Sequence, residues 1–196
     1  MNSQEARIVL ASSSAYRRAL LMRVGIECPS VSPDIDESPL PGEPPLTTAR
    51  RLALAKAQKV AERETSALII GSDQVAVLGR RVLGKPSNHA AATEQLRAMS
   101  GKSVEFHTAL CLLNAVSGKA QQTSVPTIVR FRKLDDRQIE RYLLRDRPYD
   151  CAGSAKIEAM GIALVESVES DDPSALIGLP LIALIGMLRQ EGIVIP

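Results

Sequence analysis

Cationic side chains and carboxylates in this sequence have the types and settings that phosphate chemistry requires. The cations are Arg17, Lys56 and Lys85, and the carboxylates include Asp73 and those of the acidic segment 34–37. Arginine and lysine neutralise phosphate oxygens, carboxylates bind divalent metal ions, and a carboxylate can also take a proton from an attacking water molecule. Together these residues point to hydrolysis at phosphorus.

The first of these cations follows three serines at the expected start of a helix. Ser12, Ser13 and Ser14 come after the short apolar run 8–11 and precede Arg17. The free N–H groups and the dipole of a helix N-terminus attract anions, and neighbouring hydroxyls and a guanidinium would help to bind a phosphate. The alternative is an ordinary helix N-cap with surface arginines.

Carboxylates occur both in a loop and at the end of a strand. Asp36 and Glu37 belong to an acidic loop that could hold Mg²⁺ together with substrate phosphates and water, or could simply be solvated. Asp73 follows the apolar run 67–70, and Gly71 permits close backbone approach there. Strand ends present catalytic groups in α/β proteins, although an Asp at such a position can also turn or cap the chain.

Two lysines have settings that a solvent-exposed lysine does not need. Lys56 falls within an apolar stripe of helical spacing, which comprises Ala49, Leu52, Ala53, Ala57 and Val60. A buried ammonium needs a carboxylate or a substrate phosphate as its partner, unless its stem snorkels to the surface. Lys85 follows a predicted hairpin and stands between Gly84 and Pro86. We expect both lysines to bind a polyphosphate.

Composition and missing motifs disfavour several other classes of protein. A net charge of +2, 3% aromatic residues and no tryptophan argue against a nucleic-acid-binding surface. Three cysteines without a CxxC pair and two histidines without ligand-like spacing argue against a zinc site. The motifs of P-loop kinases, Rossmann dehydrogenases and GxSxG hydrolases are absent. Because no apolar run reaches the roughly 18 residues of a membrane span, and residues 1–11 lack the pattern of a secretion signal, we expect a cytoplasmic protein without a membrane partner.

The elements that must position these residues alternate between strands and helices. The 196 residues suffice for one domain with its own core, and we expect a single domain, 1–196. Apolar runs and turn signals predict strands at 8–11, 28–32, 67–78, 82–83, 104–113, 123–132 and 161–168. Caps, helical periodicity and glycine stops, including a capping box at Asp135 and Gln138, predict helices at 15–24, 47–64, 88–99, 135–145 and 180–192. This order favours a mixed α/β sheet covered by helices.

Seven segments of the sequence resemble, in order, motifs of the Maf nucleotide pyrophosphatases. They are Ser12-Ser13-Ser14 with Arg17-Arg18, Pro33-Asp34-Ile35-Asp36-Glu37, the helix with Lys56, Gly71-Ser72-Asp73-Gln74, Leu83-Gly84-Lys85-Pro86, Cys151-Ala152-Gly153-Ser154 and Ile177-Gly178-Leu179-Pro180. The resemblance covers nearly the whole chain. It implies the Maf/inosine-triphosphatase-like α/β architecture, an elongated mixed β-sheet flanked by helices, with a cleft between two lobes.

The resemblance also implies an activity and a set of site residues. Maf proteins hydrolyse a nucleoside triphosphate to the monophosphate and pyrophosphate with a divalent metal cation, which would be Mg²⁺ or Mn²⁺. Asp73 matches the proton acceptor of the family. The positions that match phosphate and metal handling are Ser12, Arg17, Glu37, Lys56 and Lys85. We expect Glu37 to hold the metal with help from Asp36 or Asp73.

Three further positions distinguish the branches of this family by substrate. The dTTP/UTP branch has Arg, Thr and Gln where this chain has Tyr16, Gln74 and Glu158, and the pattern here resembles the branch that acts on 7-methyl-GTP. N7-methylated guanine is cationic, so an aromatic face attracts it, and Glu158 could accept hydrogen bonds from its N1–H and amino groups. The chain departs from the family at Ala15, where Pro is common, and at Tyr16, where this branch usually has Trp.

Other readings of the sequence stay open at this point. One is a pyrophosphatase for dTTP and UTP or for inosine triphosphate, and another is a non-enzymatic, nucleotide-binding regulator of cell division. In each of them the partner is a small-molecule nucleoside triphosphate. Members of the family are often dimers, which implies a homodimer without identifying its interface.

Overall fold

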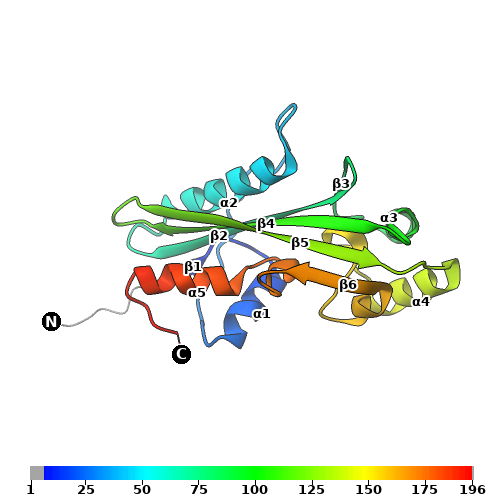
Figure 1. Cartoon of the computed structure of the whole chain (residues 1–196). Coiled ribbons are helices and arrows are strands. Elements are labelled where there is room, and N and C mark those ends of the chain that lie inside the picture. Colours follow the sequence, from blue (N-terminus) through cyan, green and yellow to red (C-terminus); the bar gives the residue numbers. More distant parts are fainter. Residues whose placement is uncertain (1–6, 196) are drawn as a thin grey trace. The chain divides into compact units, whose positions relative to one another are not determined.

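The computed structural model describes residues 7–195, whose elements form a mixed α/β fold. Within these residues six strands pair into one sheet, in the order β1 (Ile8–Leu10), β2 (Leu68–Leu78), β4 (Ser103–Asn114), β5 (Ala120–Phe131) and β6 (Val165–Ser170), with β3 (Arg81–Leu83) paired to β2. The pair β1 and β2 is parallel, whereas β2 with β3 and β5 with β6 are antiparallel. Figure 1 shows β4 and β5 as long neighbouring strands. The predicted mixed α/β class is confirmed.

Five α-helices accompany the sheet in the described part of the chain, and the fold divides into two compact units. The helices are α1 (Ala15–Arg23), α2 (Pro45–Ala61), α3 (His89–Met99), α4 (Asp136–Asp146) and α5 (Leu181–Gln190). The first unit comprises residues 7–73, 108–125 and 172–195, and the second comprises 74–107 and 126–171. None of the helices within residues 7–195 is both long and apolar enough to cross a membrane.

A hydrophobic core in the first unit joins one face of the sheet to α1 and α5. Side chains of a strand alternate between its two faces. Leu68 and Ile70 of β2 accordingly share this core with Leu110 and Leu112 of β4. The helices contribute Leu20, Leu21, Leu181, Leu184, Met187 and Leu188.

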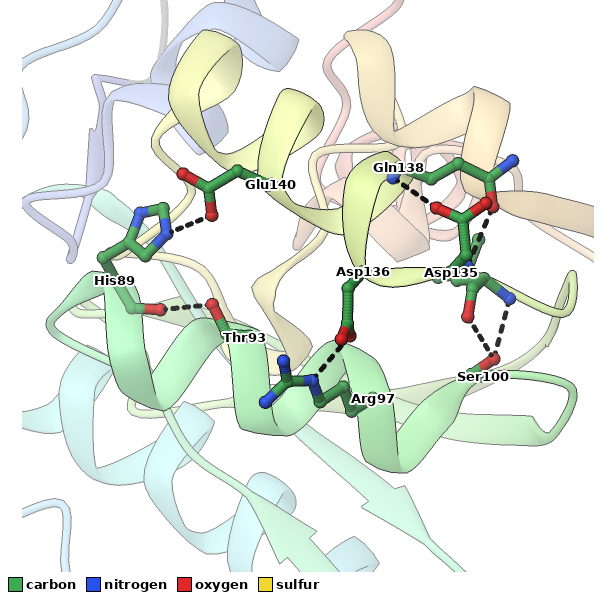
Figure 2. A network of polar contacts seen from close by, with 9 residues as sticks. His89, Thr93, Arg97, Ser100, Asp135, Asp136, Gln138 and Glu140 are labelled. Atoms are coloured by element: carbon green, nitrogen blue, oxygen red, sulfur yellow. Dashed lines mark hydrogen bonds and ion pairs between the residues drawn. The ribbon is translucent and has the colours of Figure 1, made fainter.

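In the second unit, polar contacts hold α3 against the start of α4 (Figure 2). Arg97 Nε donates to Asp136 Oδ1 over 2.8 Å. Asp135 accepts from the backbone N–H of Gln138, and the Gln138 side chain accepts from the backbone N–H of Asp135. The predicted capping box at the start of α4 is therefore confirmed.

Two elements predicted near the N-terminal end of the chain are wrong in part. Residues 28–32 form only an isolated bridge between Ser30 and Leu10, because Pro29 has no N–H with which to continue a ladder. The helix predicted at 47–64 is α2, which begins at Pro45 and ends at Ala61. Proline suits the first helical position because its fixed φ is already helical.

The strand predicted at 161–168 is also wrong in its first half. The backbone N–H groups of Ala159 and Gly161 both bond to the carbonyl oxygen of Lys156, which curls the chain into the short 3₁₀ helix η2 (Met160–Leu164). The strand β6 begins only at Val165. The other predicted elements are present, with ends that differ by at most three residues.

Candidate active site

Ser72 and Asp73 lie on opposite faces of β2, because consecutive side chains of a strand alternate. Ser72 shares the face of Leu68 and Ile70, and its Oγ lies 2.9 Å from the carbonyl oxygen of Gly178. Asp73 lies on the face against which α2 packs. The strand thus directs one polar residue to each side of the sheet at the same level.

Gly71 lets α2 approach this face closely. A Cβ atom at position 71 would overlap the carbonyl oxygen of Ala53 and would lie 3.0 Å from the Cβ of Ala57. Both neighbours are on α2, where Ala53 lies about one turn before Lys56 and Ala57 directly follows it. The missing side chain therefore sets the distance between the strand that carries Asp73 and the helix that carries Lys56.

We expect Gly71→Ala to destabilise the protein by about 3 kcal/mol, because overpacking against a backbone atom must push α2 away from β2. The same displacement should separate Lys56 from Asp73 and lower nucleotide hydrolysis. Urea denaturation at pH 7.5 measures the free energy of unfolding. The matched control is Gly186→Ala on α5, where a Cβ meets nothing within 4 Å, and where alanine favours the helix by about 0.5–1 kcal/mol. Equal stabilities of the two variants would contradict this account of Gly71.

Lys56 forms a buried ion pair with Asp73. Its Nζ lies 2.6 Å from Asp73 Oδ1 and 2.9 Å from Glu37 Oε1. The side chains of Lys56 and Asp73 are only 5% and 9% exposed, whereas that of Glu37 is 55% exposed. The carboxylate partner that an ammonium on an apolar helix face needs is therefore present, and the snorkelling alternative for Lys56 is wrong.

The environment of Asp73 raises the pKa of its carboxyl group above the ordinary value. Burial is the largest cause, and the negative charge of Glu37 acts in the same direction. The charge and hydrogen bond of Lys56 and the charge of Arg17 lower this pKa and so oppose the shift. A carboxylate with a raised pKa holds a proton more strongly, which makes Asp73 a better proton acceptor than an exposed aspartate.

Arg17 is held in place on the first turn of α1. Its Nε donates to the carbonyl oxygen of Gly178 over 2.8 Å, and its Nη1 lies 3.2 Å from Ser12 Oγ. Ser14 is the N-cap of α1, and its Oγ accepts from the backbone N–H of Arg17. The N-cap alternative for the serines is thus correct for Ser14, while Ser12 contacts the guanidinium. Burial lowers the pKa of Arg17, and the charges of Asp73 and Glu37 raise it.

The loop that follows Glu37 is fixed to α2 by an arginine. Arg51 donates from Nε and Nη2 to the two carboxylate oxygens of Glu43, both at 2.7 Å, and from Nη2 to the carbonyl oxygen of Ser38 at 3.1 Å. The hydrogen bond from Arg51 is the largest cause that lowers the pKa of Glu43 to about 2. The segment that follows Glu37 is therefore attached to α2 at two of its residues, Ser38 and Glu43.

The described carboxylates fit a divalent metal ion with two protein ligands. Glu37 and Asp73 both reach the ammonium of Lys56, so their oxygens lie close to one another. Mg²⁺ needs only one or two carboxylates when phosphate and water oxygens complete its octahedron. Asp36 accepts from the backbone N–H of Ser38 over 2.9 Å. No group of three or more His, Cys, Asp or Glu suited to a metal occurs among residues 7–195, so the set of Asp36, Glu37 and Asp73 stays a prediction.

The remaining predicted residues are distributed over both units. Tyr16 lies on α1 in the first unit and is half-buried. Gln74 follows Asp73 in β2, and Lys85 and Glu158 are exposed residues of loops; all three belong to the second unit. Their roles stay predictions.

The chain is similar to known proteins over nearly its whole length. A sequence model described as Maf-like protein matches residues 7–191, and so spans both units. The chain belongs to the Maf family. Proteins named 7-methyl-GTP pyrophosphatase are similar to it over almost their full length. One from Thiobacillus denitrificans is 54% identical over 193 residues, 98% of this chain and 96% of that protein. One from Methylobacillus flagellatus is 56% identical over 186 residues, 95% of this chain and 97% of that protein.

Gly178 of this Maf protein orients Arg17, and Ser72 lies next to Gly178. The Gly178 carbonyl receives Arg17, and Ser72 lies against the same carbonyl from β2. Both belong to segments that resemble Maf motifs, and no other feature of the sequence marks them. A backbone carbonyl has no sequence signature, and Arg17 and Gly178 are 161 positions apart.

Proposed function

We propose that this chain hydrolyses 7-methyl-GTP to 7-methyl-GMP and pyrophosphate. The observation that carries the reaction is the buried carboxylate of Asp73 held by Lys56. The substrate rests on the similarity to proteins named 7-methyl-GTP pyrophosphatase, which covers nearly the whole chain. In the reaction a water oxygen bonds to the α-phosphorus, the bond from this phosphorus to the bridging oxygen of the β-phosphate breaks, and pyrophosphate leaves.

Asp73 accepts the proton of the attacking water. Its Oδ1 is engaged by Lys56, so the proton goes to Oδ2. Lys56 holds this carboxylate in a fixed orientation and remains a positive charge beside the developing negative charge on phosphate. A divalent metal would be held by Glu37, with Asp36 or Asp73 as a further ligand. When bound, it would neutralise phosphate oxygens and polarise the water.

Phosphate binding is assigned to Ser12, Arg17 and Lys85. Ser12 and Arg17 stand at the N-terminal end of α1, where free N–H groups favour an anion. Lys85 adds a positive charge from the loop after β3. Tyr16, Gln74 and Glu158 select the base, with Tyr16 facing the methylated, cationic ring and Glu158 accepting from its N–H groups. The single domain 1–196, the homodimer and the cytoplasmic location stay predictions.

Pyrophosphate release with Mg²⁺ or Mn²⁺ tests the proposal across 7-methyl-GTP, GTP, UTP, dTTP, CTP and ITP. We expect kcat/KM for 7-methyl-GTP to exceed that for UTP by about tenfold or more, because a cation–π contact and charge-assisted hydrogen bonds favour the cationic base. In Glu158→Ala this ratio should fall about tenfold, whereas the control Glu169→Ala, which also removes an exposed charge from the second unit, should keep it.

Each other result of this assay has a definite meaning. A preference for UTP, dTTP or ITP would keep the reaction and refute the substrate. Equal losses for 7-methyl-GTP and UTP in Glu158→Ala would refute its role in reading the base. Binding of nucleotide without turnover of any substrate would favour the regulator of cell division.

A further inference from the structure

The buried side chain of Gln95 joins two segments of the second unit. Its Nε2 donates to the carbonyl oxygen of Gly84 over 3.0 Å, and its Oε1 accepts from Ser154 Oγ over 2.6 Å. Gln95 is 9% exposed and Ser154 is fully buried. The amide of Gln95 serves both partners, because its nitrogen donates to the Gly84 carbonyl, which can only accept, and its oxygen accepts from the Ser154 hydroxyl.

One of these segments is the loop that carries Lys85. Gly84 precedes Lys85 and is held by Gln95, while the backbone N–H of Ser87 donates to the carbonyl oxygen of Tyr149 over 3.0 Å. Ser87 has a left-handed backbone with φ of 63°.

The ring of Tyr149 is itself held in place, because its hydroxyl lies 3.0 Å from Nδ1 of His89. His89 also pairs with Glu140 of α4 (Figure 2). Lys85 is thus an exposed lysine on a loop that is fixed on both sides.

The other segment leads to Glu158 and contains a strained serine. Gly153 and Ser154 have φ values of 73° and 54°. This left-handed conformation is energetically unfavourable for any residue that has a side chain. Glycine would adopt this backbone without strain but has no hydroxyl. The strain at Ser154 indicates that its side chain is needed, because its hydroxyl donates the hydrogen bond to Gln95.

We propose that Gln95 and Ser154 are positioning residues for Lys85. Through them the segment 151–158 and the loop that carries Lys85 are fixed relative to each other. This inference rests on the proposed function, in which Lys85 binds phosphate and Glu158 reads the base. Gln95 and Ser154 themselves touch no substrate. Their effect on hydrolysis passes through the position of Lys85.

A double-mutant cycle with Lys85 tests this inference, with 7-methyl-GTP as substrate. Gln95→Met should lower kcat/KM about tenfold in the wild-type background and less than about twofold in Lys85→Met, because two residues that act as one unit are not additive. Thr93→Val is the matched control. It removes a hydroxyl of α3 that bonds within the helix, to the carbonyl of His89, and kcat/KM should not change.

Ser154→Gly separates positioning from folding. It relieves the left-handed strain, so the melting temperature should stay within about 4 °C of the wild type, while kcat/KM falls and the loss again disappears in the Lys85→Met background. Equal fold losses with and without Lys85 would overturn the inference, because they indicate a general structural effect. Unchanged kcat/KM in both variants would also overturn it.

Failure of the proposed function would be visible separately, as absence of turnover in the wild type. The same cycle is then measured as binding of inorganic tripolyphosphate by calorimetry. A loss of affinity in Gln95→Met that depends on Lys85 would support the positioning role, and a loss independent of Lys85, or no loss, would refute it.

Discussion

Asp73→Asn should lower kcat for hydrolysis of 7-methyl-GTP by about a thousandfold, within the range that loss of a general base produces. The substitution keeps the shape of the side chain and an oxygen to accept from Lys56, whose Nζ lies 2.6 Å from Oδ1 in the native protein. An amide cannot take a proton from water at neutral pH. The loss should therefore appear in turnover with the fold retained.

The measurement is pyrophosphate release at saturating nucleotide and metal, with circular dichroism to compare the folds. Asp171→Asn is the control, because it removes an exposed carboxylate that has no place in the mechanism. If Asp73→Asn kept full activity, Asp73 would not be the proton acceptor.

Lys56→Met should abolish activity and destabilise the protein by about 3–5 kcal/mol at pH 7.5, the usual cost of removing one partner of a buried ion pair. Methionine fits an apolar helix face, so the cost arises from the carboxylate of Asp73, which is left buried without its counter-charge. Urea denaturation in the presence of EDTA measures this cost without metal. Lys59→Met, one turn away and 41% exposed, should change stability by less than about 0.5 kcal/mol.

The destabilisation by Lys56→Met should depend on pH. Burial already raises the pKa of Asp73, and loss of Lys56 removes the largest cause that lowers it. A carboxyl group with a raised pKa in the folded state is most favourable below its unfolded pKa, and stability is lost as the pH rises through the folded pKa. The variant should therefore lie closest to the wild type near pH 4 and furthest from it at neutral pH. A difference that is the same at both pH values would contradict a charged Asp73 as the cause.

Much of the site could be predicted because its signals are local. A lysine in the apolar stripe of α2 requires a partner, and alternation along a buried strand directs Asp73 to one face. The capping box at Asp135 and Gln138 depends on residues three positions apart. Each inference uses only the chemistry of a residue and its near neighbours.

What could not be predicted depends on contacts between distant backbone groups. The carbonyl that orients Arg17 belongs to Gly178, and the amide that links two loops belongs to Gln95, whose type is common on exposed helices. The sequence pattern places the start of α2 too late, because Thr47 and Thr48 resemble caps, whereas Pro44 and Pro45 determine the first turn. The Thr48 hydroxyl lies against Glu43 and the carbonyl of Pro44 instead.

The hydrogen bonds from Arg51 to Glu43 and Ser38 affect the thermodynamics of ligand binding. It ties the chain beside Glu37 to α2 through three hydrogen bonds, and a carboxyl group with a pKa of about 2 keeps its charge even in moderately acidic solution. The conformational entropy of this loop is therefore lost when the protein folds. A nucleotide that arrives later meets a preorganised segment, so less of its interaction energy is consumed in ordering the chain.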